Sequence, residues 1–159
     1  MPKINPFLWF ETQAQEAANF YVSIFPNSKI LQVTHYNEAG PGTPGSVMTV
    51  DFELDGQHIT ALNGGPEFKF NEAVSLYVGC TTQAEVDDYW AKLTAGGGEE
   101  GPCGWLKDKF GLSWQVDPAV LGEMLADPDR GKAQRVMAAM LQMKKIDIPT
   151  LERAYNQGG

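Results

Sequence analysis

Cys103-Gly-Trp-Leu-Lys-Asp-Lys-Phe-Gly-Leu-Ser-Trp-Gln-Val116 is the stretch of sequence that decides the fold. Two short runs of extended character, Trp105 to Asp108 and Leu112 to Val116, flank a turn. Gly111 lies in that turn, where glycine can adopt a positive φ without steric cost. The pattern therefore predicts a β-hairpin.

The second strand of this hairpin presents different chemistry on its two faces. Because successive side chains of a strand point to opposite faces, Trp114 and Val116 share one face, and Ser113 and Gln115 share the other. A polar group on the second face would project into whatever space lies on that side of the sheet. Whether that space is a binding pocket decides the function.

Length and composition favour one domain that needs no disulfide staple. The chain has 159 residues, 43% of them hydrophobic, which is enough to bury a core. Its net charge of -8 would repel a phosphate backbone, so we expect no nucleic-acid partner. Only two cysteines occur, Cys80 and Cys103, which favours a reducing compartment, and we expect a cytoplasmic protein. No signal peptide or membrane-spanning apolar run is visible, so we expect no membrane partner.

The order of the predicted elements repeats along the chain. The first half predicts a strand, a helix and three strands, at Ile4–Phe10, Glu11–Phe25, Lys29–Tyr36, Val47–Leu54 and Gln57–Asn63. The second half predicts the same order, at Val74–Gly79, Thr82–Ala95, Glu99–Cys103 and the two strands of the hairpin. A shift of 69 positions lays Glu16 on Glu85 and Leu8 on Tyr77. We therefore predict an α+β fold of two βαβββ modules, at about residues 1–64 and 72–118.

The remaining residues, 119–159, are predicted to be a helical extension. A short helix over Val120–Leu125 precedes a longer one over Gly131–Lys145, and a last helix runs from Asp147 to Tyr155. In the first module, Thr12 is the expected N-cap of the helix that follows it.

Several segments together resemble a known family. They are Asn5–Phe10, Glu16–Tyr21, Glu85–Trp90, Gly97-Gly98 and Trp105–Trp114. These residues are similar to the PhnB-like branch of the vicinal-oxygen-chelate superfamily, which includes glyoxalase, bleomycin-resistance proteins and dihydroxybiphenyl dioxygenase. Members of the branch often carry the label 3-demethylubiquinone-9 3-methyltransferase. The resemblance covers Ile4 to Pro118.

This resemblance implies a glyoxalase/bleomycin-resistance-like fold, in which two βαβββ modules curl their mixed sheet into a cup. A second subunit frequently completes the cup, so we expect a homodimer. In the metal enzymes of the superfamily, usually two His and two Glu from the first and last strands of each module hold a divalent ion. The corresponding positions here fall on Pro6, Ser75, Thr60–Asn63 and Gln115, which are poor substitutes. We therefore expect no metal and no other cofactor.

A pocket for a flat organic ligand is the functional reading that the strands favour. Seven residues are the candidates for contacting the ligand: Trp9, Asn63, Tyr77, Cys103, Trp105, Trp114 and Gln115. The aromatic members could wall the pocket, and the amides could supply placed polar groups. Core packing is the alternative explanation for each aromatic residue taken singly.

Other reactive side chains have both a chemical and a structural explanation. His35 and His58 could act as a general base, although a surface or hairpin position is favoured for each. Asp51 and Glu53 share a strand face and could abstract a proton, or they could simply be solvated. Cys103 could be a nucleophile, but a structural thiol is favoured.

The methyltransferase label requires a separate test against the sequence. Binding of S-adenosylmethionine normally uses a glycine-rich turn between a strand and a helix. Gly96-Gly-Gly98 instead follows a predicted helix and precedes a predicted strand, so it is a helix stop. We expect no binding of S-adenosylmethionine.

The sequence thus predicts a metal-free homodimer that binds a small hydrophobic or aromatic molecule. One alternative is a metal-dependent lyase, isomerase or dioxygenase that uses substitutes such as His58, Asn63 and Gln115. A second alternative is a structural or regulatory dimer whose terminal helices recruit a partner.

Overall fold

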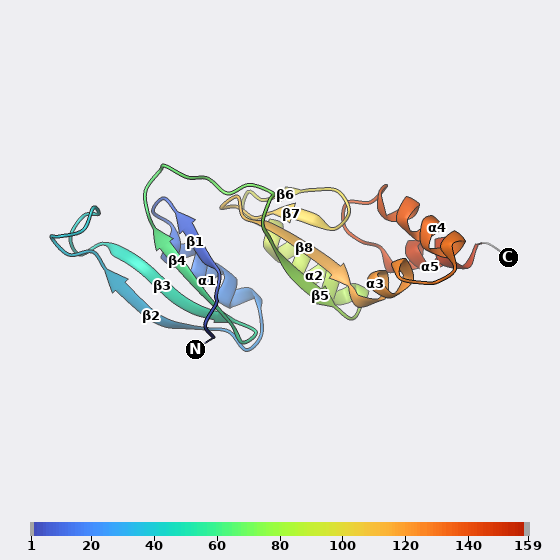
Figure 1. Ribbon diagram of the computed structural model, residues 1–159, viewed down its shortest axis with the longest axis horizontal. Helices are drawn as coiled ribbons and strands as arrows, with labels where there is room; N and C mark the ends of the chain where they lie inside the picture. The colour runs from blue at the N-terminus through green and yellow to red at the C-terminus, as the bar shows by residue number, and fades with distance from the viewer. Residues whose placement is uncertain (1, 158–159) are drawn as a thin grey trace. The chain divides into compact units, whose positions relative to one another are not determined.

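The structure, a computed structural model, describes residues 2–157 and divides into two compact units, one ending at Phe70 and the other beginning at Asn71 (Figure 1). Each unit contains a four-stranded mixed sheet and a helix that packs on it. The second unit carries three further helices within the described residues. None of the helices in residues 2–157 is both long enough and apolar enough to cross a membrane.

The two units repeat one βαβββ order, as predicted. The first contains β1 (Phe7–Phe10), α1 (Ala14–Ile24), β2 (Lys29–His35), β3 (Val47–Leu54) and β4 (Gln57–Asn63). The second contains β5 (Ser75–Cys80), α2 (Gln83–Thr94), β6 (Glu99–Glu100), β7 (Trp105–Lys107) and β8 (Ser113–Pro118). The strand orders are β1-β4-β3-β2 and β5-β8-β7-β6, and the first and last strands of each unit pair in parallel. The prediction of an α+β fold is confirmed.

In each sheet, one face packs on the helix and the other turns away from it. In the first unit the Tyr21 ring of α1 lies 6.3 Å from the ring of Phe52, which is fully buried. In the second unit α2 packs on β7 and β8, whose inward residues Leu106 and Trp114 are Cα partners and are both buried. We call the opposite side of each sheet its open face. Alternation places Gln115 on the open face, as the sequence predicted.

The helices begin at caps that the sequence predicts only in part. Helix α1 has Gln13 at its N-cap position, and no side chain at that position caps the helix. Instead the side chain of Asn63 accepts a hydrogen bond from the Ala14 N–H at 2.8 Å. The prediction that Thr12 caps this helix was therefore wrong, because a residue from the distant end of β4 does so. In α2, by contrast, Thr82 accepts from the Glu85 N–H, a local cap that the sequence does show.

The number of positions that separates corresponding residues of the two units differs by one between the helices and the first strands. Helices α1 and α2 begin at Ala14 and Gln83, which fits the predicted shift of 69. Strands β1 and β5 end at Phe10 and Cys80, which gives a shift of 70, because the connection to the helix is one residue shorter in the second unit. The alignment of Leu8 with Tyr77 was therefore wrong: Leu8 is 7% exposed, whereas Tyr77 is 61% exposed.

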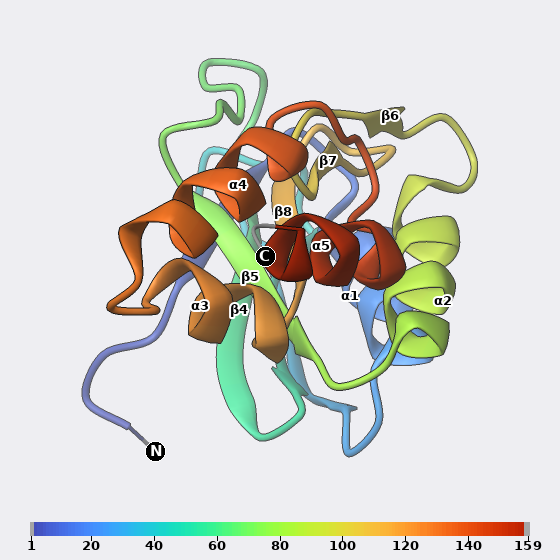
Figure 2. The ribbon, with the colours of Figure 1, turned by 90° about the vertical axis from the view of Figure 1, so that its right-hand side faces the viewer.

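The C-terminal extension forms a helical cluster with its own core. It contains α3 (Ala119–Leu125), α4 (Arg130–Met140) and α5 (Ile148–Asn156), which lie together in Figure 2. Buried apolar side chains hold the cluster: Leu121, Met124, Val136, Ile146 and Leu151. The predicted helix over Gly131–Lys145 ends early, at Met140, so the residues between α4 and α5 are free to make other contacts.

Candidate functional site

The open face of the second sheet borders a cavity of about 430 Å³. Its lining includes Pro102, Cys103, Trp105, Lys107 and Ser113, together with three glutamates, Glu72, Glu99 and Glu100. We call this space the β7 cavity. Strands β7 and β8 place two of its side chains, because Lys107 and Ser113 are Cα partners. Trp105 pairs in the same way with Gln115, so the indole and the amide lie on one face.

Asp108 fixes the hairpin that carries these residues. One carboxylate oxygen accepts from the backbone N–H groups of Phe110 (2.8 Å) and Leu112 (3.1 Å). The other accepts from the indole N–H of Trp114 at 2.9 Å. Asp108 is 3% exposed, so these bonds form largely out of contact with water. They hold Trp114 in the core and leave the other face of β8 open to the cavity.

Ser113 supplies an unsatisfied polar group in the wall of the cavity. The residue is 1% exposed, and within the described part of the chain its hydroxyl oxygen has no hydrogen-bond partner. Leaving a buried hydroxyl unpaired costs on the order of 1–3 kcal/mol. A ligand would have to displace the atoms that cover this oxygen in order to bond to it, and it would then remove that cost.

The charged groups of the β7 cavity are mostly acidic. Lys107 forms an ion pair with Glu72; the hydrogen bond and the charge of the lysine lower the pKa of Glu72, and the glutamate raises the pKa of Lys107 in turn. Glu100 accepts from the indole N–H of Trp90 at 2.7 Å. Glu99 adds a third carboxylate to the lining. The lining therefore carries three carboxylates against one ammonium group.

In both units a polar residue in or just before the first strand is hydrogen-bonded to a polar residue of the last strand. Gln115 donates to the Ser75 hydroxyl at 3.0 Å. With the corrected shift of 70, the residue that corresponds to Ser75 is Asn5, and Asn5 donates to the Thr60 hydroxyl at 3.4 Å. Thr60 donates in turn to Asp51 at 2.6 Å. With this shift Pro6, the position that the resemblance assigns in the first strand, corresponds to Leu76 instead of Ser75.

The resemblance assigns the metal-ligand positions to Pro6, Ser75, Gln115 and the range Thr60–Asn63, and Asn5 is the neighbour of Pro6 that the shift of 70 pairs with Ser75. Asn5, Thr60, Ser75 and Gln115 carry neutral amides and hydroxyls, which already bond to one another. Within residues 2–157 no group of three or more His, Cys, Asp and Glu is placed to hold an ion. This donor set does not fit a centre built from imidazole and carboxylate.

Asp117 continues the row of open-face residues on β8. One of its oxygens is buried and has no partner among the described residues, and burial raises the pKa of the carboxyl group to about 6. Its Cα partner is Gly79, which contributes no side chain above it. Burial, and then the charge of Asp117, also raise the pKa of Tyr77. Sequence alternation could have identified Asp117, because it lies two residues beyond Gln115.

We expect the Asp117→Asn variant to be more stable than the wild type above pH 6, but not below pH 4. The carboxyl pKa is higher in the folded chain than its ordinary value of 3.8, so stability falls as the pH rises from about 4 to 6. Since the group is partly solvated, the gain at pH 7.5 should be about 1–2 kcal/mol. Urea unfolding at pH 4 and pH 7.5 measures it. An equal effect at both pH values would contradict this interpretation.

The structure brings four of the predicted ligand residues to the open face of the second sheet or to the cavity beside it. Cys103 and Trp105 line the β7 cavity. Gln115 lies on the same face and is bonded to Ser75, and Tyr77 projects from β5 with 61% of its surface exposed. Ser113, Lys107 and Asp117 were not predicted as site residues.

The other predicted ligand residues lie elsewhere. Trp114 is 2% exposed and belongs to the core, on the face that packs on α2. Trp9 donates to the Gly65 carbonyl at 2.9 Å, and its ring packs edge-on against Phe68. Asn63 caps α1 and also lines a second cavity, of about 570 Å³, within the first unit.

The histidine and carboxylate candidates lie on the first sheet. Asp51 and Glu53 share its open face, as predicted, and His58 is the Cα partner of Glu53. His58 lies in the β3–β4 hairpin, one of the two positions expected for it, and is 5% exposed. His35 ends β2 and is exposed.

The repeated helix-on-sheet units define a fold of the glyoxalase/bleomycin-resistance class. FosX, the fosfomycin resistance protein of Listeria monocytogenes, shares this fold with a TM-score of 0.58 and 16% identity, over 79% of this chain and 98% of that one. PA1353 from Pseudomonas aeruginosa matches with a TM-score of 0.60 and 17% identity, over 74% and 98%.

A stronger similarity identifies the family. The family model described as 3-demethylubiquinone-9 3-methyltransferase matches residues 2–117. The PhnB protein from Bacillus cereus is 39% identical, with a TM-score of 0.66, over 74% of this chain and all of that one. No curated protein matches the chain. The chain therefore belongs to the PhnB-like family of the vicinal-oxygen-chelate superfamily, and its C-terminal helices follow the matched domain.

Proposed function

We propose that this protein binds a small, flat hydrophobic or aromatic molecule in the β7 cavity. The observation that carries the proposal is the buried hydroxyl of Ser113, which lacks a partner in the cavity wall. Trp105 and Pro102 contribute apolar surface to the lining of the same cavity. Binding pockets for organic ligands combine such an apolar lining with a few placed polar groups.

The charge of the lining selects among aromatic ligands. Glu72, Glu99 and Glu100 outnumber Lys107, and Lys107 is already paired with Glu72. An anionic ligand would meet net repulsion, whereas an amine could lie over the Trp105 indole beside a carboxylate. The ligand is therefore neutral or cationic, with a hydroxyl or amine that can bond to Ser113.

A matched series of naphthalenes tests this proposal. We expect naphthalen-2-ylmethanol and naphthalen-2-ylmethanamine to bind, and 2-naphthoate to bind roughly tenfold more weakly, as expected for a difference of about 1.4 kcal/mol. Calorimetric titration measures all three. Saturable binding should also protect Cys103 from alkylation by iodoacetamide, while Cys80 is buried and serves as the internal reference. The absence of saturable binding by all three compounds would refute the proposal.

The Ser113→Ala variant tests two effects of the unpaired hydroxyl separately: its effect on folding stability and its effect on ligand affinity. The ligand-free variant should be about 1 kcal/mol more stable than the wild type, because a buried unsatisfied group is removed. Its affinity for naphthalen-2-ylmethanol should fall roughly 3- to 10-fold, the value of one hydrogen bond. Ser23→Ala, at an exposed serine of α1, is the control. Unchanged affinity in Ser113→Ala would contradict the assigned role.

The proposed binding requires no metal and no S-adenosylmethionine. Ser75, Gln115 and Thr60 are among the positions that the resemblance assigns to metal ligands, and their neutral side chains bond in the pairs Asn5–Thr60 and Ser75–Gln115. The glycines after α2 act as a helix stop, with positive φ at Gly96 and Gly97, rather than as a nucleotide turn. We expect elemental analysis to find no stoichiometric divalent metal in the purified protein. Calorimetry should detect no binding of S-adenosylmethionine, and a micromolar dissociation constant would overturn this expectation.

We also propose that the protein is a homodimer. Phe7 and Tyr77 occupy corresponding positions of β1 and β5 and are 59% and 61% exposed on the open faces of their sheets. Large exposed aromatic side chains are typical of surfaces that a partner covers. Sedimentation equilibrium tests the proposal, and a monomer at tens of micromolar would refute it.

A further inference from the structure

The segment between α4 and α5 contacts the wall of the β7 cavity. We call residues Met143–Ile148 the strap. The backbone N–H of Cys103 donates to the Met143 carbonyl at 2.9 Å, and that of Gly104 donates to the Lys144 carbonyl at 2.8 Å. Cys103 lines the cavity, and Trp105 follows directly. The strap therefore bonds to the backbone that positions two cavity residues.

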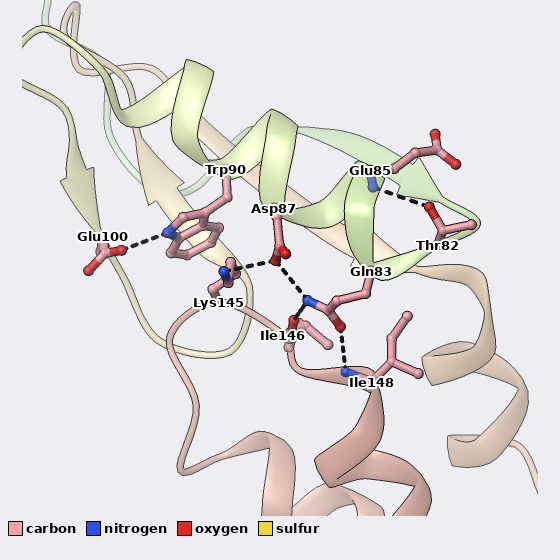
Figure 3. A network of polar contacts seen from close by, with 9 residues as sticks. All are labelled: Thr82, Gln83, Glu85, Asp87, Trp90, Glu100, Lys145, Ile146 and Ile148. Carbon is pink, nitrogen blue, oxygen red and sulfur yellow. Dashed lines mark hydrogen bonds and ion pairs between the residues drawn. The ribbon is translucent and has the colours of Figure 1, made fainter.

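The opposite side of the strap is attached to α2, as Figure 3 shows. Gln83 donates to the Ile146 carbonyl at 2.9 Å and accepts from the Ile148 N–H at 2.7 Å. Gln83 also donates to Asp87, at 2.9 Å, and Asp87 forms an ion pair with Lys145 at 2.8 Å. Because Asp87 and Lys145 are both about half exposed, that ion pair contributes little by itself. The bonds of Gln83 to the backbone are the main attachment.

The loop Cys103–Trp105, which forms part of the cavity wall and which we call the wall loop, has an unfavourable backbone conformation that hydrogen bonds must stabilise. Cys103 has φ 57°, a left-handed value that is unfavourable for a side chain other than glycine, and Gly104 follows with φ 84°. A local hydrogen bond from the Trp105 N–H to the Pro102 carbonyl, at 3.0 Å, closes this turn, and tertiary contacts add to it. The strap supplies one hydrogen bond to Cys103 and one to Gly104, and the Gly104 carbonyl accepts from Val116 of β8 at 2.8 Å.

We infer that the C-terminal extension contributes to the ligand site by holding the backbone of Cys103–Trp105 in place. Gln83 is the positioning residue, because its hydrogen bonds attach the strap to α2. The role of the strap in ligand affinity depends on the proposed function, whereas its control of the wall loop does not. Because coupling free energies are reciprocal, a ligand in the β7 cavity stabilises the docked strap to the extent that the strap increases ligand affinity. The strap lies outside the residues that the family model matches, 2–117.

The Gln83→Met variant tests the inference, because it keeps the length of the side chain and removes its hydrogen bonds. We expect amide exchange at Cys103 and Gly104 to accelerate roughly tenfold, as expected for about 1.4 kcal/mol of lost local stability. Alkylation of Cys103 by iodoacetamide should accelerate with it. Lys92→Ala is the matched control, since it removes the Lys92–Asp88 ion pair from the same helix and does not touch the strap.

A second pair of variants tests whether the changes come from the strap or from a general loss of stability. Lys145→Ala should give a smaller change of the same kind, and Lys145→Arg should restore wild-type behaviour by keeping the ion pair with Asp87. Affinity for naphthalen-2-ylmethanamine should fall in Gln83→Met but not in Lys92→Ala. If no naphthalene binds the wild type, the proposed function fails, and the exchange and alkylation rates still decide the role of the strap. Equal rates in Gln83→Met and Lys92→Ala, or a larger effect in Lys145→Ala than in Gln83→Met, would overturn the inference.

Discussion

Replacing Asp108 by alanine should lower the free energy of unfolding of the second unit by about 3–5 kcal/mol. Three donors lose their acceptor at once: the backbone N–H groups of Phe110 and Leu112, and the indole of Trp114. Leu112 and Trp114 are each 2% exposed, so water cannot readily replace the carboxylate. The loss should exceed that of any single neutral hydrogen bond, because a charged acceptor strengthens each of the three.

Urea unfolding followed by tryptophan fluorescence measures this loss. Asp88→Ala is the control, because Asp88 is an exposed aspartate of α2 whose ion pair with Lys92 lies on the surface, and it should cost less than about 1 kcal/mol. Asp108→Asn keeps one carbonyl oxygen as an acceptor and should fall between the two. A loss below about 1 kcal/mol in Asp108→Ala would show that Asp108 does not organise the hairpin.

Local patterns were enough to predict the order of the elements and the two faces of β8. Alternation along β8 separated Trp114 from Gln115 correctly, because a strand buried on one face imposes a strict period of two. The main alignment error has a separate cause. A connection that is one residue shorter in the second unit changes the internal shift of the first strands from 69 to 70, so Ser75 was paired with Pro6 although it corresponds to Asn5.

The features that the sequence could not predict depend on partners far away in the chain. Asn63 caps α1 from 49 positions beyond Ala14, and this pairing exists only after the sheet forms. The unpaired state of the Ser113 hydroxyl is likewise a property of the packed structure. Residues 141–145 carry helix-compatible side chains, but the bonds of the strap to Cys103 and Gly104 outweigh local helix propensity there.

We expect Gly104→Ala to lower the free energy of unfolding more than any other variant except Asp108→Ala, because Gly104 packs closely against β8 and the strap. An added Cβ would lie 2.4 Å from a carboxylate oxygen of Asp117, and 3.1 Å from both a side-chain carbon of Ile146 and the carbonyl oxygen of Val116. It would also hold an L residue at φ 84°. The backbone term costs about 1–2 kcal/mol, and forced packing typically adds about 1–3 kcal/mol.

Gly111→Ala provides a control that separates these two terms. Gly111 has a similar φ of 89°, but no atom lies within 4 Å of the position that its Cβ would occupy. Its substitution should therefore cost only the backbone term, about 1–2 kcal/mol. The difference between the two variants in urea unfolding isolates the contact of Gly104 with Asp117 and with the strap. Since that contact holds the cavity wall, alkylation of Cys103 should accelerate in Gly104→Ala but not in Gly111→Ala. Equal stability of the two variants would mean that the close packing at Gly104 does not constrain the wall.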